Sequence, residues 1–143
     1  MGKKRIVLDT SVFICGLLSK GTSNEILKLI LDKKVLLLLT EEILREYVKV
    51  IFYQKFKFDR SYALAFLREL SKKSMSGDTK EHFNLCRDKE DDKFLDIVYA
   101  SKADFLITLD KDLLELRDEN KEFQIKEHKF QILRPEEFLG NKM

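Results

Sequence analysis

The sequence predicts a single α/β domain in which a central, mainly parallel sheet of four to five strands lies between two layers of helices. Short, continuously apolar runs alternate along the chain with longer segments of helical periodicity. Such runs are typical of strands buried on both faces, and their alternation with helices is typical of a parallel sheet. No repeat or linker divides the 143 residues, so we expect one domain over residues 1–143.

The first predicted strand is residues 5–8, a short apolar run. Residues 9–21 contain two glycines and are interpreted as a loose connection. Thr22 and Glu25 have the spacing of a capping box before an apolar periodic run, which predicts a helix over residues 23–33.

Residues 35–39 are a second apolar run and predict a second strand. Thr40 follows as a suitable N-cap for a helix over residues 41–54. Asp59 opens a further amphipathic helix that continues through Leu70.

Residues 74–90 are rich in Ser, Asp and Lys, and they are interpreted as a loop with a possible strand near Phe83. Asp91 or Asp92 is expected to open a helix that runs to about Lys102.

Residues 105–108 and 130–133 are two more apolar runs and are predicted to be strands. A short helix is expected over residues 113–117, and a terminal helical turn over residues 135–139, which begin with the only proline of the chain.

Composition excludes several classes of protein. Lys and Arg exceed Asp and Glu by 27 to 25, and a net charge of +2 by itself indicates no nucleic-acid partner. Cys15 and Cys86 are far apart, and neither His82 nor His128 has zinc-site spacing with them, so we expect reduced thiols. No apolar run is long enough to span a bilayer, which predicts a cytoplasmic protein without membrane contact.

Acidic residues follow two of the predicted strands. Asp9 ends the first predicted strand and is followed by the hydroxyl residues Thr10 and Ser11. The predicted strand over residues 105–108 likewise ends with a hydroxyl residue, Thr108, and is followed by an acid, Asp110. Ligands bind at the carboxyl ends of strands in open α/β sheets, and Mg²⁺ prefers oxygen ligands, so both acids could share one cation. The alternative for Asp9 is a turn residue that accepts hydrogen bonds from its own backbone.

Glu46 lies beside the apolar stripe of its predicted helix, three and four residues from Ile43 and Val50. A partly buried carboxylate needs a cationic partner or a metal ion. The alternative is an ordinary surface pair with Arg45 or Lys49.

Three further acids lie at or near a predicted helix start. Asp91 and Asp92 could serve only as N-terminal acids, and Asp112 could cap the helix that follows it. Asp96 is one turn after Asp92 on the same face, where two acids repel each other unless something neutralises them.

Taken together, these segments resemble the PIN domain, a metal-dependent nuclease fold, and especially its VapC-like toxin ribonucleases. The likeness covers about residues 5–139. The segments that carry it read VLDTSV over residues 7–12, EEILREY over 41–47, RDKEDDKFLD over 87–96 and ADFLITLDKDL over 103–113.

The resemblance implies an acidic catalytic and metal-binding site for Mg²⁺ or Mn²⁺. Asp92 is preferred to Asp91 because it lies sixteen residues before Thr108, the spacing that this family shows. The implied ligands are Asp9, Glu46, Asp92 and Asp110. The residues implied for a second shell or a second metal are Thr10, Ser11, Asp96, Thr108 and Asp112. Ser11 stands where relatives often have Asn, and Lys102 where many have Gly.

The implied activity is hydrolysis of RNA phosphodiester bonds by the toxin of a toxin–antitoxin pair, with a protein antitoxin and a second copy of the chain as partners. Two alternatives stay open within the family: an RNA-processing nuclease outside a toxin system, and a PIN domain that binds RNA or protein without cutting. A receiver-like phosphotransfer domain also uses a strand-end Asp with Mg²⁺, but it needs an acid pair shortly before that residue. Here Lys4 and Arg5 precede Asp9.

A basic segment with interleaved aromatic residues could guide an RNA backbone toward the acids and stack its bases. The alternative is a solvated charged face with the rings in the core or in a dimer interface. The basic residues are Lys49, Lys55, Lys57, Arg60, Arg68, Lys72 and Lys73, and the aromatic residues are Phe52, Tyr53, Phe56 and Phe58.

Overall fold

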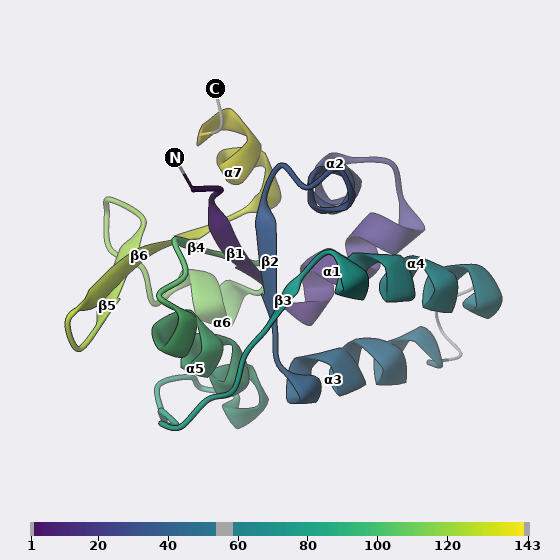
Figure 1. Cartoon of the computed structure of the whole chain (residues 1–143). Coiled ribbons are helices and arrows are strands. Elements are labelled where there is room, and N and C mark those ends of the chain that lie inside the picture. Colours follow the sequence, from purple (N-terminus) through teal and green to yellow (C-terminus); the bar gives the residue numbers. More distant parts are fainter. Residues whose placement is uncertain (1, 54–58, 142–143) are drawn as a thin grey trace.

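The computed structural model describes residues 2–53 and 59–141, in which a six-stranded sheet lies between helices (Figure 1). The strand order is β3-β2-β1-β4-β6-β5, and every neighbouring pair is parallel except β5 with β6. The strands are β1 (Arg5–Leu8), β2 (Leu36–Leu39), β3 (Met75–Ser76), β4 (Phe105–Ile107), β5 (Glu122–Ile125) and β6 (His128–Leu133). The predicted fold class is confirmed, with six strands in place of four to five.

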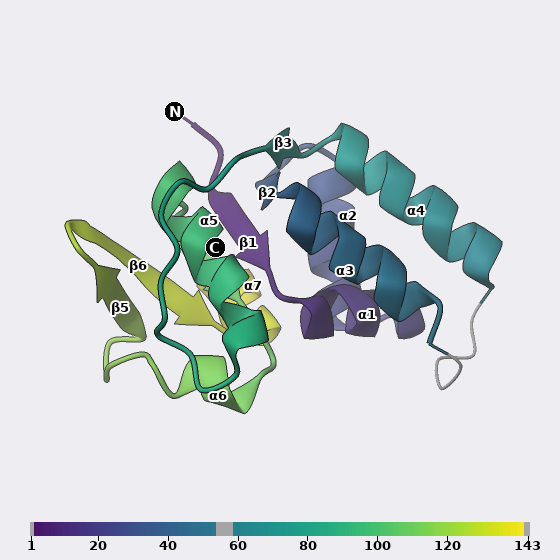
Figure 2. The same ribbon diagram turned by 90° about the horizontal axis from the view of Figure 1, so that it is seen from below.

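Helices cover both faces of the sheet. Helix α5 packs against β1 and β4 on one face, while α7 and α2 lie together on the opposite side, as Figures 1 and 2 show from two directions. The helices are α1 (Thr10–Leu18), α2 (Thr22–Leu31), α3 (Glu41–Ile51), α4 (Arg60–Lys72), α5 (Asp92–Ser101), α6 (Lys111–Leu114) and α7 (Pro135–Asn141), with a 3₁₀ turn η1 (Lys89–Asp91) before α5.

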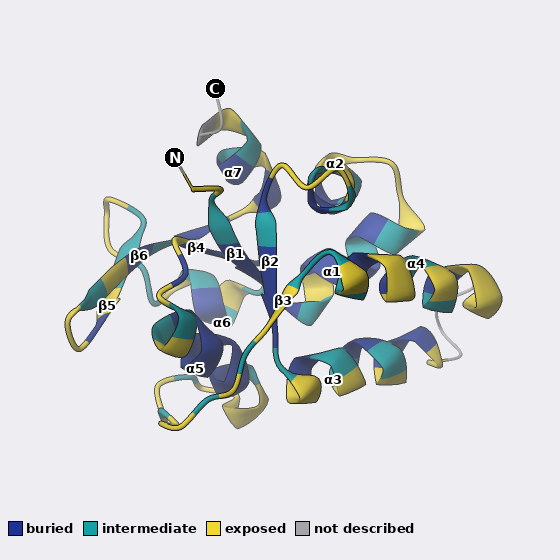
Figure 3. Cartoon of the chain, in the orientation of Figure 1, coloured by how far each residue is buried: buried dark blue, intermediate teal, exposed yellow. Residues whose placement is uncertain are grey.

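The core joins the sheet to its helices through fully buried side chains, which appear dark blue along β1, β4 and α5 in Figure 3. Phe13 of α1 stacks on Tyr47 of α3 with ring centroids 4.3 Å apart. A buried Tyr hydroxyl needs a hydrogen-bond partner, and that of Tyr47 donates to the Leu8 carbonyl at 2.5 Å. This contact ties α3 to the carboxyl end of β1.

The register of the sheet brings two sequence-distant segments to one edge. Leu8 of β1 is paired with Ile107 of β4, so Asp9 and Thr108 follow the strands at the same level. The chain adds β2 and β3 on one side of β1, and then crosses to add β4 on the other. The carboxyl ends of β1 and β4 therefore form the topological switch point, where open α/β sheets bind ligands.

Residues 9–21 contain helix α1 in place of the expected loose connection. Asp9 caps this helix, since its carboxylate accepts from the Val12 N–H. A Cβ at Gly16 would lie 2.5 Å from Leu27 Cδ1 of α2, so this glycine permits the close packing of two helices.

Several local expectations were wrong. Thr22 is the first residue of α2 and makes no capping bond, because Gly21 takes the N-cap position. No strand forms at Phe83; β3 is a two-residue strand further upstream. The α6 helix is capped by Asp110 and not by Asp112, since Asp110 accepts from the Asp112 N–H at 2.9 Å.

Most other boundaries agree with the sequence prediction. Thr40 caps α3 by accepting from the Ile43 N–H at 3.1 Å, and Asp59 caps α4. Helix α3 ends at Ile51 and not near the expected residue 54, which lies outside the described residues. None of the helices in residues 2–53 and 59–141 is long and apolar enough to cross a bilayer.

Candidate active site

Asp9 lies at the carboxyl end of β1 and is almost completely buried. One carboxylate oxygen accepts from Ser11 Oγ at 2.5 Å and from the Val12 N–H at 3.2 Å, and the other accepts from Thr108 Oγ1. Burial raises the pKa of Asp9 to about 6 against the lowering effect of these bonds, and the nearby charge of Asp110 raises it further. Ser11 and Thr108 therefore fix the orientation of a carboxylate in a poorly solvated position.

Asp110 follows β4 at the same edge of the sheet. Its backbone N–H donates to Thr108 Oγ1 at 2.8 Å, so one hydroxyl connects Asp110 to Asp9. Asp91, in η1, lies close enough to Asp110 for that carboxyl to affect its pKa. Burial first, and then the nearby Asp110 carboxyl, raise the pKa of Asp91 to about 8.

Asp92 binds the segment that precedes α5. Its carboxylate accepts from the backbone N–H groups of Leu85 at 3.0 Å and Cys86 at 2.8 Å. The structure thus places Asp91 beside Asp110 and ties one oxygen of Asp92 to the segment before α5. The cause is geometric, because neighbouring residues of a helix point about 100° apart and Asp92 is the first residue of α5.

Asp96 lies one turn further along α5 and also binds the segment before the helix. It accepts from the Phe83 N–H at 2.8 Å and contacts His82 Nδ1 at 2.9 Å. Asp92 and Asp96 therefore hold residues 82–86 against α5, and the structure does not bring Asp96 to the other acids as the sequence analysis expected.

Glu46 has a cationic partner that the sequence analysis missed. One oxygen, Oε1, pairs with Lys93 Nζ at 2.6 Å, and the other accepts from Thr10 Oγ1. The alternative, a surface pair with Arg45 or Lys49, does not form among the described residues, and Arg45 pairs with Glu41. Lys93 lies between Asp92 and Phe94 in α5 and is buried there, and a lysine is rarely buried unless it is paired.

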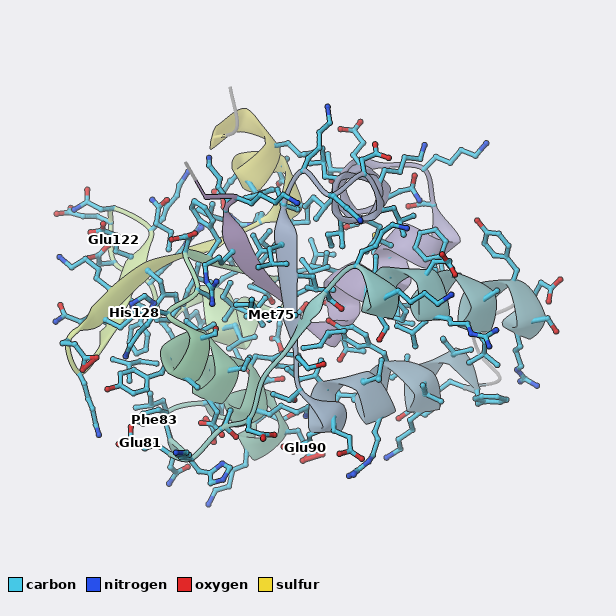
Figure 4. The ribbon with its side chains drawn as sticks, viewed as in Figure 1. Met75, Glu81, Phe83, Glu90, Glu122 and His128 are labelled. Atoms are coloured by element: carbon cyan, nitrogen blue, oxygen red, sulfur yellow. The ribbon has the colours of Figure 1, made fainter. Side chains whose placement is uncertain are left out.

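A groove of about 440 Å³ extends outward from these acids along α3. Its lining includes Glu46, Asp91 and Lys93 at one end and Arg45, Lys49 and Tyr53 along α3. Figure 4 shows Glu90, another lining residue, next to the start of α3.

The basic and aromatic segment is only partly described. Residues 55–58 lie outside the described part of the chain, so the expected contribution of Lys55, Phe56, Lys57 and Phe58 cannot be placed. The Arg60 guanidinium lies 5.6 Å from the centre of the Phe52 ring, and Lys72 and Lys73 pair with Glu69. Arg68 is exposed on α4. These basic residues are thus distributed over α3 and α4.

The donor chemistry of the strand-end acids suits a hard divalent cation. Asp9, Asp91 and Asp110 offer only carboxylate oxygens, and the pKa values of Asp9 and Asp91 are raised first by burial and then by the nearby carboxyl of Asp110. Over residues 2–53 and 59–141, no group of three or more His, Cys, Asp or Glu side chains is already arranged to hold a metal ion. The carboxylate of Asp112 pairs with Arg87, with Asp112 Oδ1 3.7 Å from Arg87 Nη1.

The fold and this edge of the sheet define an α/β protein of nuclease type. The sequence profile of the PIN domain matches residues 5–112, and the chain belongs to this family. It is 36% identical over 141 residues to a Methanocaldococcus jannaschii protein named "Uncharacterized protein MJ1680", covering 96% of this chain and 90% of that protein.

Proposed function

We propose that the protein is an endoribonuclease that depends on Mg²⁺ or Mn²⁺ and hydrolyses RNA phosphodiester bonds. The observation that carries this proposal is the position of Asp9 and Asp110 at the switch point between β1 and β4, where the Thr108 hydroxyl joins them and Asp91 lies near Asp110. A buried Asp9 with half-buried Asp91 and Asp110 nearby is costly for folding alone, and such a group suits a site that acquires a cation.

Asp9, Asp91 and Asp110 are the residues proposed to hold the ion. When bound, it would lower the pKa of a water molecule and offset negative charge that develops on the phosphate. The surrounding residues act on the acids themselves: Ser11 and Thr108 orient Asp9, and the Asp112 N–H orients Asp110. Thr10, Ser11 and Thr108 thus support the ligands and need not bind metal.

RNA is proposed as the substrate because the groove that leads away from the acids combines cations with a ring. Arg45 and Lys49 can contact phosphates, and Tyr53 is placed where a base could stack.

The proposed biological role is that of a cytoplasmic toxin that pairs with itself and is held inactive by a protein antitoxin. This role rests on the likeness to VapC-like proteins. Induced expression that leaves growth unaffected would argue for the alternative, an RNA-processing nuclease outside a toxin system.

The catalytic proposal is tested by incubating purified protein with a mixed RNA panel in Mn²⁺ and in EDTA. Cleavage by the wild type should require the metal and fall at least about a hundredfold in Asp9→Asn. Asp32→Asn is the matched control, because it removes the same charge from an exposed residue between α2 and β2, at the opposite edge of the sheet. Cleavage that persists in EDTA, or equal cleavage by Asp9→Asn and wild type, would refute the proposal.

A further inference from the structure

We propose that Lys93 is a positioning residue that neutralises Glu46 from within the protein, so that Glu46 orients the site without binding the metal ion directly. The inference rests on the proposed metal-dependent function. It assigns to Lys93 a role in setting the charge of the acidic site, and it divides the acids into two groups with different partners.

Lys93 is placed as a fixed internal cation. It is only 7% exposed, although its Nζ carries a charge. That Nζ lies 2.6 Å from Glu46 Oε1, donates to the Glu90 carbonyl, and lies 5.3 Å from the centre of the Phe94 ring. Burying an ammonium group is costly unless it is paired and hydrogen-bonded, and these three contacts meet that need. Lys93 therefore has little freedom to leave Glu46.

Both oxygens of Glu46 already have protein partners. Lys93 occupies Oε1 and the Thr10 hydroxyl occupies Oε2. Thr10 directly follows Asp9, so the Glu46 carboxylate also holds the turn that carries Asp9. Each oxygen keeps a second lone pair, but Lys93 already neutralises the charge of Glu46, so Glu46 attracts a metal ion less strongly than an uncompensated carboxylate does.

Asp91 and Asp110 differ from Glu46 in this respect. Neither has an ion-pair partner among the described residues, and their carboxyls lie near each other. The uncompensated negative charge is therefore on Asp9, Asp91 and Asp110, and a divalent ion would be attracted to that group. Glu46 with Lys93 adds no net charge to it.

This division makes opposite predictions for two single variants. Lys93→Met removes the cation and leaves Glu46 uncompensated, which should strengthen Mn²⁺ binding. Glu46→Gln leaves Lys93 uncompensated near the metal, which should weaken it. A unit charge about 6 Å from a divalent ion in water changes affinity roughly tenfold in either direction. The double variant Glu46→Gln/Lys93→Met removes both charges together, so its Mn²⁺ affinity should return to within about threefold of the wild-type value.

The experiment is a Mn²⁺ titration of the full chain, followed by electron paramagnetic resonance, with thermal melting recorded for each variant. Lys93→Arg keeps the positive charge, so this variant should bind Mn²⁺ like the wild type. It also provides a second test of the charge of residue 93 if Lys93→Met does not fold. Lys102→Met is the matched control, since it breaks another 2.6 Å Lys–Glu pair at the opposite end of α5 and should leave Mn²⁺ affinity unchanged.

The double variant decides between a positioning role and direct ligation. If Glu46 is a direct ligand, the double variant will bind Mn²⁺ as weakly as Glu46→Gln, and the inference is wrong. Unchanged Mn²⁺ affinity in Lys93→Met would also overturn the inference about Lys93. The proposed function would still hold in that case if RNA cleavage by the wild type requires the metal. A wild-type chain that binds no Mn²⁺ would overturn both.

Discussion

Asp91 and Asp92 are adjacent in the chain but have different surroundings. Asp91 lies near Asp110, whereas Asp92 accepts two backbone N–H groups from the segment before α5. The sequence could not separate them, because a count of residues to Thr108 does not show which way each side chain points. Asp9 and Asp110 were predictable, since a strand end fixes where the following side chain lies.

The two residues should therefore respond differently to the same substitution. Asp91→Asn should lower Mn²⁺ affinity and RNA cleavage at least about tenfold, because it removes a carboxylate from the acid group. Asp92→Asn should keep Mn²⁺ affinity within about threefold but cost roughly 1 kcal/mol of stability, because it weakens two charge-assisted hydrogen bonds. Mn²⁺ titration and urea unfolding of both variants provide the measurement. The reverse pattern would restore the original preference for Asp92.

At the scale of elements, the segment between β3 and α5 has little regular structure and is held by side chains. Phe83 packs edge-on against Tyr99 of α5 with ring centroids 5.3 Å apart, and Glu81 pairs with Lys126 at 2.8 Å. Figure 4 shows Phe83 and Glu81 next to each other. Asp96 adds bonds to His82 and Phe83 on the same helix face.

Loss of the Asp96 carboxylate should loosen this segment without unfolding the domain. Asp96→Ala removes the acceptor for the Phe83 N–H, so amide exchange at Phe83 should accelerate about tenfold or more. Exchange in β1 should be much less affected. Hydrogen–deuterium exchange of both segments in this variant and in Asp78→Ala, an exposed control, makes the comparison. Equal acceleration in both variants would show that Asp96 does not hold the segment.

Glu137 links α7 to β6. It accepts from Arg117 Nη1 and from the Arg134 N–H, both at 2.8 Å, and Lys121 is 3.2 Å away. Burial raises the pKa of Glu137, but the bonds from Arg117, the Arg134 N–H and Lys121 outweigh burial and lower it to about 2.

A carboxyl with a lowered folded-state pKa stabilises the fold above its unfolded value of 4.5 and loses that effect as the pH falls toward 2. Glu137→Gln should lower the free energy of unfolding by about 1–3 kcal/mol at pH 7. This difference from the wild type should become smaller as the pH falls from 4.5 to 2. Unfolding free energies across this range test the expectation, with exposed Glu136→Gln as control. A difference independent of pH would show that the charge of Glu137 does not contribute.

Helices and strands were predicted correctly where a local sequence pattern determined them. The prediction failed where contacts between distant residues determined the structure. The strands β1, β2 and β4 are short and mostly apolar runs, and helix α4 begins at the predicted Asp59 cap. Helix α1 was missed because Gly16 was interpreted as a loop residue, although it permits contact with Leu27. The edge strand β5 was missed because its sequence is partly polar.

At the scale of the whole molecule, the part of the chain beyond the PIN profile completes the sheet. The profile match ends at residue 112, but β6 pairs in parallel with β4 along Phe105 to Ile107. Phe138 of α7 is fully buried and packs against Phe105 with centroids 5.4 Å apart.

Residues after 118 should therefore be required for folding. A chain ending at residue 118 would expose the β4 edge and the apolar surface that β6 and α7 cover, so we expect it to be unfolded or aggregated. Circular dichroism melting and gel filtration of this truncation, beside the full chain, measure the effect. A cooperative melt and a monomeric elution for the truncated chain would contradict the prediction.

The central claim is that Asp9, Asp91 and Asp110 form one metal site at the switch point of the sheet. The most direct test is an anomalous difference map from crystals of the full chain grown with Mn²⁺. We predict a Mn²⁺ peak within ligand distance of all three carboxylates, with the Glu46–Lys93 pair intact beside it. A peak bound instead by Asp92 and Asp96, or no peak at this edge in crystals of a chain that cleaves RNA only with Mn²⁺, would contradict the account.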